Sequence, residues 1–406
     1  MNSITLADGN NGGLAANYSI SSGQTTTANV TTKALTVSGI TASNKTYDAT
    51  NSATLGTGSV NYGGLVSGDD FAGSYSGVFA NANVGSGKTV TITSSYAGND
   101  VSNYSITNQS STTADISAKA LTATASASNK VYDGSSTATT TLSLSGFIGS
   151  ETVTSTNSST FNNKNAATGK TVTVNSITLA DGSNGGLAAN YSISTGQTTT
   201  ANITAKSLTV SGITASNKIY DGGTTAATTL SFSGLIGSET LGQTVGSTFD
   251  NKNVGTGKTV TVNSITLADG NNGGLAANYS INPGQTTTAN VTTKALTVSG
   301  ITASNKTYDA TTSATLGTGS VNYGGLVSGD DFAGSYAGVF ADANVGSGKT
   351  VNITSSYSGS DVSNYSVTNQ SSTTADISAK ALTATASASN KVYDGSSTAT
   401  TTLSLS

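Results

Sequence analysis

One short stretch of the sequence carries the residue types of a nucleotide site. NVGSGKT, at 83–89, ends like a phosphate-binding loop, in which backbone N–H groups and a lysine hold the phosphates. Such a loop needs a glycine five positions before Gly87, where Ala82 stands, and it must open a helix. Because the β-type sequence TVTIT follows instead, we expect a hairpin turn here and no bound nucleotide.

Acidic residues offer the other candidate sites, for a cation or for acid–base catalysis. ADGNNGG, at 7–13, supplies Asp and Asn oxygens but lacks the spacing and the closing Glu of an EF-hand, so it predicts a turn. Asp69 and Asp70 are adjacent and recur as Asp330 and Asp331, but neighbours on a strand point to opposite faces and would not share a proton. Solvated loop charge is expected, and no metal or cofactor is predicted.

Missing residue types narrow the chemistry further. The 406 residues include no Cys, His or Trp, which removes thiolate and imidazole zinc sites, Cys nucleophiles and His-based triads. Charged residues make up 9% of the chain, where soluble domains usually carry about a quarter. All sixteen basic residues are lysines and the net charge is −4, so nucleic-acid binding is not expected. No run of 18 apolar residues could span a membrane, and we predict that the chain is not an enzyme.

Internal repetition explains the sequence better than a catalytic site does. Three markers recur at a spacing of about 87 residues: Lys-Ala/Ser-Leu-Thr, Tyr-Asp and Asn-Tyr-Ser. The Lys marker begins at Lys33, Lys119, Lys206, Lys294 and Lys380. The predicted domains are the C-terminal part of a truncated repeat at 1–32, complete repeats at 33–118, 119–205, 206–293 and 294–379, and the N-terminal part of a truncated repeat at 380–406.

A longer period lies above this unit. Residues 2–145 and 263–406 differ at nine of 144 positions, which indicates recent duplication of a block of three repeats. The chain also begins in the middle of a repeat and shows no signal peptide, so we expect a segment of a longer array.

Strand patterns fill each repeat. KTVTV, at 170–174, alternates apolar and polar residues, and many such short segments are separated by Gly/Asn/Asp turns. This pattern predicts an all-β fold, a tandem array of Ig-like β-sandwich domains of about 87 residues joined end to end. The apolar phase runs on even numbers through Ala114 and Ile116 but on odd numbers from Leu121, so it flips at Lys119. We expect the last strand of one repeat to run directly into the next, without a flexible linker.

The Tyr-Asp(-Gly) motif is the most regular marker. We expect its Tyr ring to fill the core with a hydrogen-bonded hydroxyl, and its Asp to cap an Asx turn at a strand end. Ala49 and Ala310 stand where other repeats have Gly, and Ala in a left-handed turn would cost about 1 kcal/mol, so an obligatory left-handed turn is not expected. The motif residues are Tyr47, Asp48, Tyr132, Asp133, Gly134, Tyr220, Asp221, Gly222, Tyr308, Asp309, Tyr393, Asp394 and Gly395.

Four segments together resemble the YDG domain. They are ASNKVYDG (127–134), FNNKNAATGKTVTV (161–174), NYSI (190–193) and TTTANITAKSLTV (198–210). YDG domains occur in tandem in very large bacterial surface and secreted proteins, including filamentous-haemagglutinin-like adhesins. The resemblance implies a stalk module on the bacterial cell surface or secreted from the cell, whose partners are neighbouring repeats of the same chain. It brings no catalytic residues.

The sequence therefore predicts a structural stalk or shaft segment that projects a distal binding region. Two alternatives stay open. Identical chains could pair laterally through edge strands into a filament, or the repeats could bind glycan or mucin weakly and gain strength by avidity. The tyrosines outside the repeat motifs, such as Tyr62 and Tyr75, would be the stacking platform in the second case. Asn-x-Ser/Thr sequons, for example at Asn190 and Asn278, leave glycosylation open, although a turn role is favoured.

Overall fold

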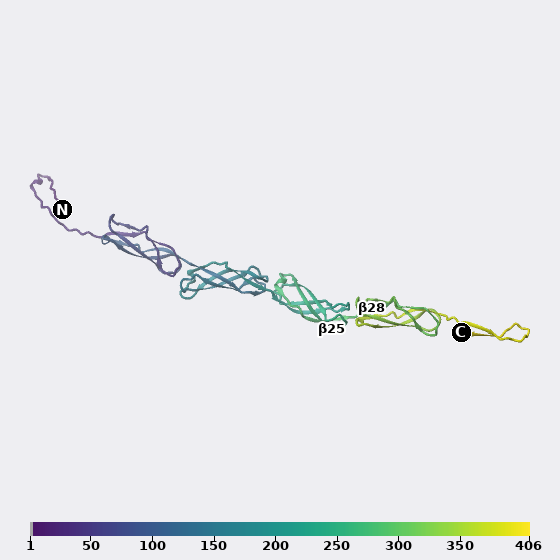
Figure 1. The fold of residues 1–406 in the computed structure, drawn as a ribbon. Coiled ribbons are helices and arrows are strands. Elements are labelled where there is room, and N and C mark those ends of the chain that lie inside the picture. The colour runs from purple at the N-terminus through teal and green to yellow at the C-terminus, as the bar shows by residue number, and fades with distance from the viewer. Residues whose placement is uncertain (1–2) are drawn as a thin grey trace. The chain divides into compact units, whose positions relative to one another are not determined.

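The computed structural model of the protein describes residues 3–406, and its regular elements are β-strands and a few three-residue 3-10 turns (Figure 1). These residues form two compact units. The first comprises the described residues up to 129 with 135–164 and 168–202, and the second comprises 130–134, 165–167 and 203–406. In the part of the chain that the structure describes, no helix is both long and apolar enough to cross a membrane.

The strands recur with the repeat. Those of residues 33–118 are β1 (Lys33–Ser38), β2 (Thr41–Ala42), β3 (Lys45–Thr46), β4 (Ser52–Ala53), β5 (Leu55–Gly56), β6 (Asn61–Gly63), β7 (Ala72–Phe79), β8 (Gly85–Ala97), β9 (Tyr104–Thr107) and β10 (Ser111–Ser117). Those of residues 119–205 are β11 (Lys119–Ala127), β12 (Lys130–Val131), β13 (Thr137–Ala138), β14 (Thr140–Ser145), β15 (Val153–Phe161), β16 (Ala167–Asp181), β17 (Tyr191–Ile193) and β18 (Thr198–Thr204).

The later repeats follow the same plan. Residues 206–293 contain β19 (Lys206–Ser207), β20 (Thr209–Ala215), β21 (Lys218–Ile219), β22 (Thr225–Ala226), β23 (Thr228–Ser233), β24 (Leu241–Phe249), β25 (Gly255–Asp269), β26 (Tyr279–Ser280) and β27 (Thr286–Thr292). Residues 294–379 contain β28 (Lys294–Ser299), β29 (Thr302–Ala303), β30 (Lys306–Thr307), β31 (Ser313–Ala314), β32 (Leu316–Gly317), β33 (Asn322–Gly324), β34 (Ala333–Phe340), β35 (Gly346–Ser358), β36 (Tyr365–Thr368) and β37 (Ser372–Ser378). A last hairpin joins β38 (Ala384–Ala388) to β39 (Thr401–Leu405).

Short 3-10 turns precede the Asn-Tyr marker. They are η1 (Ala15–Asn17), η2 (Val101–Asn103), η3 (Ala188–Asn190), η4 (Ala276–Asn278) and η5 (Val362–Asn364). Each ends at the Asn of the marker, so the repeat places this Asn and the following Tyr at the same point of every domain.

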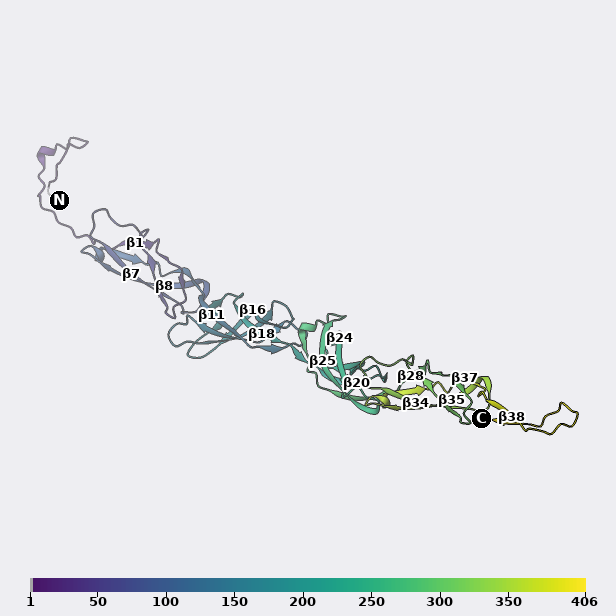
Figure 2. The same cartoon turned by 45° about the vertical axis from the view of Figure 1, so that its right-hand side comes forward.

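Each repeat is a two-layer sandwich, which confirms the predicted all-β fold class. In the first unit, residues 33–118 form a three-stranded sheet of order β6-β1-β9 and a five-stranded sheet of order β3-β10-β8-β7-β4. In the second unit, residues 294–379 repeat this order as β33-β28-β36 and β30-β37-β35-β34-β31. Figure 2 labels β28, β34, β35 and β37 of this repeat. The pairings β1–β9 and β3–β10 are parallel, a detail that strand patterns in the sequence do not reveal.

Alternating side chains build the core between the two layers. Leu35 and Val37 point inward from β1, and Ile92 and Tyr104 meet them from β8 and β9. In β8 the buried pair Val90 and Ile92 continues the alternation of the TVTIT segment. This segment belongs to strand β8, and the NVGSGKT stretch spans the end of the hairpin loop between β7 and β8 and the first residues of β8, so no helix follows it.

The connection between repeats is direct. β10 ends at Ser117 and β11 begins at Lys119, so a single residue separates the last strand of one sandwich from the first strand of the next. In the second unit β27 and β28 are joined in the same way. This confirms the continuous connection that the phase flip at Lys119 predicts.

Candidate functional site

The most elaborate side-chain arrangement in the structure lies where two repeats meet. In the first unit one hydrophobic cluster includes Tyr47 and Phe79 of the earlier repeat together with Leu121, Val153 and Tyr191 of the later one. The two sandwiches therefore share buried apolar surface. We call this contact the joint.

A carboxylate occupies the centre of the joint in the first unit. The Tyr47 hydroxyl donates a hydrogen bond to Glu151 Oε1 at 2.8 Å, and the Tyr191 hydroxyl donates to Oε2 at 2.6 Å. The two rings meet edge to face, with centroids 5.6 Å apart. Burial, together with the neighbouring Glu151 carboxylate, raises the pKa of Tyr47 to about 12. The hydroxyl therefore stays protonated and acts as a hydrogen-bond donor near neutral pH.

An asparagine adds a second polar contact across the same joint. Asn190, from the Asn-Tyr marker, accepts a hydrogen bond from the backbone N–H of Val84 at 2.9 Å and donates to Asn83 Oδ1 at 3.1 Å. Its side chain is buried. A glycan cannot be attached to a buried asparagine that binds the neighbouring repeat, so this sequon is a structural feature.

The second unit repeats the arrangement with an aspartate. Tyr220 and Tyr365 both donate to Asp330 Oδ2, at 2.8 Å and 2.5 Å, and their rings are 5.5 Å apart. Asn364 accepts from the Val254 N–H at 2.9 Å. Burial and the Asp330 carboxylate raise the pKa of Tyr365 to about 12.

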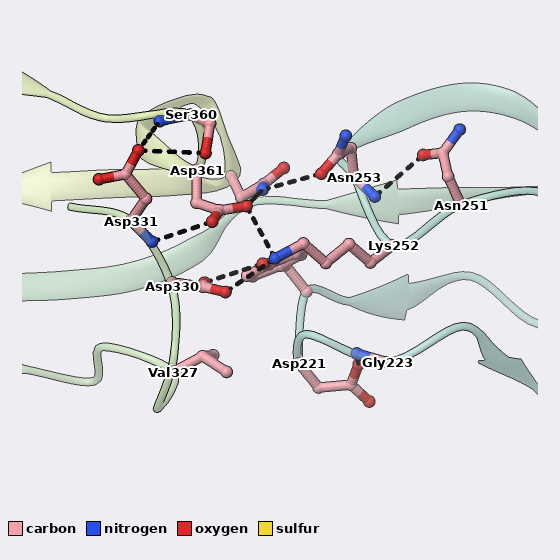
Figure 3. Close-up of polar contacts among 12 residues, drawn as sticks. Asp221, Gly223, Asn251, Lys252, Asn253, Val327, Asp330, Asp331, Ser360 and Asp361 are labelled. Carbon is pink, nitrogen blue, oxygen red and sulfur yellow. Dashed lines mark hydrogen bonds and ion pairs between the residues drawn. The ribbon is translucent and has the colours of Figure 1, made fainter.

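Lys252 distinguishes this joint from the one in the first unit (Figure 3). Its ammonium lies 2.9 Å from Asp330 Oδ1 and 2.8 Å from Asp361 Oδ1, and 5.9 Å from the centre of the Tyr220 ring. Hydrogen bonds to Asp361 and Asp330 raise the pKa of Lys252. The same lysine is the main cause that holds the pKa of Asp361 below its ordinary value. For Asp330, burial alone would raise the pKa, but hydrogen bonds from Tyr365, Lys252 and Tyr220 outweigh it and lower it.

A third instance of the arrangement lies inside the second unit. Tyr132 donates to Glu239 Oε1 at 2.7 Å, and Tyr279 donates to Oε2 of the same residue at 2.6 Å. The two tyrosine rings are again edge to face, 5.4 Å apart. Three Tyr-Asp motifs thus end on a carboxylate that a second tyrosine also binds.

These contacts correct two expectations from the sequence. The acidic pair containing Asp330 was expected to be solvated loop charge, but the Asp330 side chain is only 3% exposed and bridges two repeats. The Tyr of the Tyr-Asp motif fills a core shared with the next repeat at Tyr47, Tyr132 and Tyr220, whereas the expectation of a buried ring is wrong for Tyr308 and Tyr393, which are exposed. An acidic residue stands at this point in every complete repeat, as Asp69, Glu151, Glu239 and Asp330, and this recurrence was the available signal.

The rest of the motif shapes the turn that carries the Tyr. Asp48 accepts from the Thr50 N–H at 2.9 Å and pairs with Lys45 at 2.8 Å, which is the Asx turn that the sequence predicts. The same Lys–Asp pair forms at Lys218–Asp221, Lys306–Asp309, Lys391–Asp394 and Lys130–Asp133.

The residue after the Asp is left-handed in every repeat, contrary to expectation. Ala49 and Ala310 have φ of 60° and 68°, close to the 78° and 81° of Gly134 and Gly222. The turn geometry therefore persists without glycine, and alanine adopts the strained conformation. Gly395 has φ of 73°.

Two complete repeats each have one end that does not form such a joint among the described residues. In repeat 33–118 it is the acceptor end with Asp69, and in repeat 294–379 it is the end with Tyr308. Asp69 binds the Tyr104 hydroxyl at 2.5 Å and lines a cavity of about 360 Å³ with Val66 and residues 30–33. At the other end of the array Tyr308 is 38% exposed, and the more distant Tyr393 is exposed as well.

The remaining candidates are structural. Asp8 accepts from the Ala15 N–H at 2.6 Å, which makes ADGNNGG a turn. Tyr62 and Tyr96 pack against Phe71 with ring centroids 5.2 Å away, and the Tyr75 hydroxyl donates to that of Tyr62. Among the described residues no group of three or more Asp and Glu side chains is arranged to hold a metal ion.

The fold and the joints define a tandem-repeat protein of β-sandwich domains that bind their neighbours along the chain. The model of the YDG domain family matches residues 31–114, 117–201, 204–289 and 292–375. The chain belongs to this family. No curated protein matched the chain.

Proposed function

We propose that the chain is a structural segment of the stalk of a large extracellular bacterial adhesin, where it holds a distal binding region away from the cell. The shared core at the joints carries the proposal. A stalk needs connections that resist bending and proteolysis, and here one residue links strands of adjacent sandwiches while a half-buried carboxylate binds a tyrosine from each side. In this role the chain performs no catalysis and binds no cofactor.

Composition and family support an extracellular location. The chain has no Cys, so its folding does not depend on whether the compartment permits disulfide bonds. It is also rich in Ser, Thr, Asn and Gly, and only 9% of its residues are charged. Tandem YDG domains are found in bacterial surface and secreted proteins. The net charge of −4 without any arginine gives no surface for nucleic acid.

The competing functions receive less support from the strands and aromatic rings. The five-stranded sheet of residues 33–118 ends in the two-residue strands β3 and β4, and such short edges offer little for lateral pairing into a filament. Glycan stacking needs exposed rings, whereas Tyr62 and Tyr75 pack against the domain core.

Negative-stain electron microscopy of the purified chain at dilute and high concentration tests the proposal. We expect single unbranched particles about 160–200 Å long, from roughly 35–45 Å for each sandwich with strands of about ten residues. A variant with four Gly/Ser residues inserted after Ala118 is the control and should show a bend at one joint. Bundles or continuous fibres would make lateral assembly the function, and compact particles would exclude a stalk.

A further inference from the structure

The charged groups at the joints differ from one repeat to the next. Repeats 33–118 and 294–379 carry two aspartates at the end that receives a Tyr-Asp motif, and we call this end a double-aspartate acceptor. Its residues are Asp69 and Asp100 in the first case and Asp330 and Asp361 in the second. Repeats 119–205 and 206–293 carry one glutamate there, and Leu187 and Leu275 stand at the position of Asp361.

At the opposite end of each repeat, one of the variable positions in the segment before Gly-Lys-Thr carries either lysine or alanine. Lys164 and Lys252 occupy it in the two middle repeats, and Ala82 and Ala343 occupy it in the outer two. Ala82 faces the single glutamate Glu151, whereas Lys252 faces a double-aspartate acceptor. No alanine-bearing end precedes two aspartates in the sequence.

Lys164 precedes the single glutamate Glu239, so a lysine-bearing end is not confined to double-aspartate acceptors. The contacts explain the converse, that two aspartates follow a lysine. Asp330 and Asp361 are 3% and 10% exposed, and the charge of Asp330 raises the pKa of Asp361 unless a cation compensates. Lys252 lies within 2.9 Å of both carboxylates while its own side chain is 35% exposed. A joint with one carboxylate and two tyrosine donors holds without lysine, as Glu151 shows, but two buried carboxylates need a positive charge.

We propose that Lys252 is the cation that a double-aspartate acceptor requires, so that such a repeat can follow only a lysine-bearing repeat, whereas a lysine-bearing repeat can precede either kind of acceptor. Repeat 33–118 then accepts a lysine-bearing repeat in the cavity beside Asp69, and an alanine-bearing end would leave Asp69 and Asp100 uncompensated. The inference concerns the order of repeats and does not depend on the stalk function.

Amide hydrogen exchange of the full chain tests the proposal, because two N–H groups report on two joints separately. Val254 donates to Asn364 across the joint with lysine, and Val84 donates to Asn190 across the joint without it. We expect K252A to accelerate exchange at Val254 about tenfold or more, after correction for intrinsic rates, and to leave Val84 unchanged.

Second variants separate charge from packing and from misfolding. K252M keeps the apolar stem over Tyr220 and should accelerate Val254 as K252A does. The double variant K252A/D361N removes the second negative charge and should restore slow exchange at Val254. K306A removes a lysine outside this joint and should have no effect there.

Three results would overturn the proposal. They are unchanged Val254 exchange in K252A, wild-type exchange in K252M, and failure of D361N to restore protection in the K252A background. Protection of the core amides of Val260 and Val351 shows in each variant whether the two sandwiches remain folded.

Discussion

At the scale of single residues, each of the three positions of the YDG motif has a different structural role. The Tyr crosses the joint, the Asp holds the turn, and the third residue adopts a left-handed backbone. Close packing against the next repeat also favours glycine at the third position. A Cβ on Gly222 would lie 2.7 Å from Cγ1 of Val327, and one on Gly134 would lie 2.8 Å from Cγ2 of Ile236. The glycine therefore admits the side chain of the next repeat as well as the positive φ.

This argument gives opposite outcomes for two substitutions. Ala49→Gly relieves a left-handed alanine and should stabilise its turn by about 1 kcal/mol. Gly222→Ala adds both backbone strain and the close contact with Val327, so it should destabilise its turn by more than that. Exchange of the Tyr47 and Tyr220 amides, which donate to Ser117 and Thr292, measures each turn locally. Slower exchange in G222A, or faster exchange in A49G, would contradict this account.

At the scale of elements, a glutamine fastens the end of the first strand in two of the repeats. Gln109 accepts from the Ile40 N–H at 3.0 Å and donates to the Ile40 carbonyl at 2.7 Å. Gln370 makes the same pair of bonds with Ile301. Just after β1 or β28 ends, the glutamine side chain bonds the backbone N–H and carbonyl of the isoleucine. A neighbouring strand would otherwise provide these two hydrogen bonds.

Removing one of these glutamines should loosen one strand end and not the other. Gln109→Ala leaves the buried Ile40 N–H and carbonyl without partners, which costs about 1–3 kcal/mol. We expect much faster exchange of the Ile40 amide in this variant. The Ile301 amide, held by Gln370 in the other unit, is the internal control and should not change. Equal protection of Ile40 in the variant and the wild type would show that the side chain contributes nothing.

Local patterns in the sequence predicted the elements well, and long-range contacts explain what they missed. The alternation of apolar and polar residues predicted the strands, and the phase flip at Lys119 predicted the direct connection between repeats. Both features depend only on residues that are close together in the sequence. The joint depends on residues about 105 positions apart, such as Tyr47 and Glu151, which no local pattern relates. The left-handed Ala49 was missed for another reason, since propensity argues against a conformation that the local bonds of Asp48 to Thr50 and Lys45 accompany.

At the scale of the molecule, the joints combine neighbouring repeats into larger folding units. In the second unit one hydrophobic cluster runs from Phe249 and Val260 of one repeat to Leu296 and Val298 of the next. Each sandwich is small and gains buried surface from its neighbour, as in other repeat arrays. Conditions that break a joint should therefore weaken both repeats that share it.

The charges at the joint in the second unit predict a pH range over which it stays closed. Asp330 and Asp361 have lowered pKa values in the folded chain, so their contribution to stability is present above about 3.9, the ordinary pKa of Asp, and is lost as the pH falls below it. For Tyr365 the folded pKa is raised to about 12, so its contribution is complete below about 10 and is lost as the pH rises toward 12. The joint should hold from about pH 4 to about pH 10.

Tyrosinate absorbance at 295 nm between pH 9 and 13 tests the alkaline limit, with circular dichroism as a check that the strands persist. Tyr47, Tyr279 and Tyr365 should ionise late, near pH 12, because each is buried and donates to a carboxylate that an ionised hydroxyl would repel. Tyr365→Phe should remove one equivalent from the late phase. Since the variant also withdraws a donor from Asp330, Val254 should exchange faster at neutral pH. A single transition near pH 10 in a folded chain would mean that the hydroxyls do not bind these carboxylates in solution.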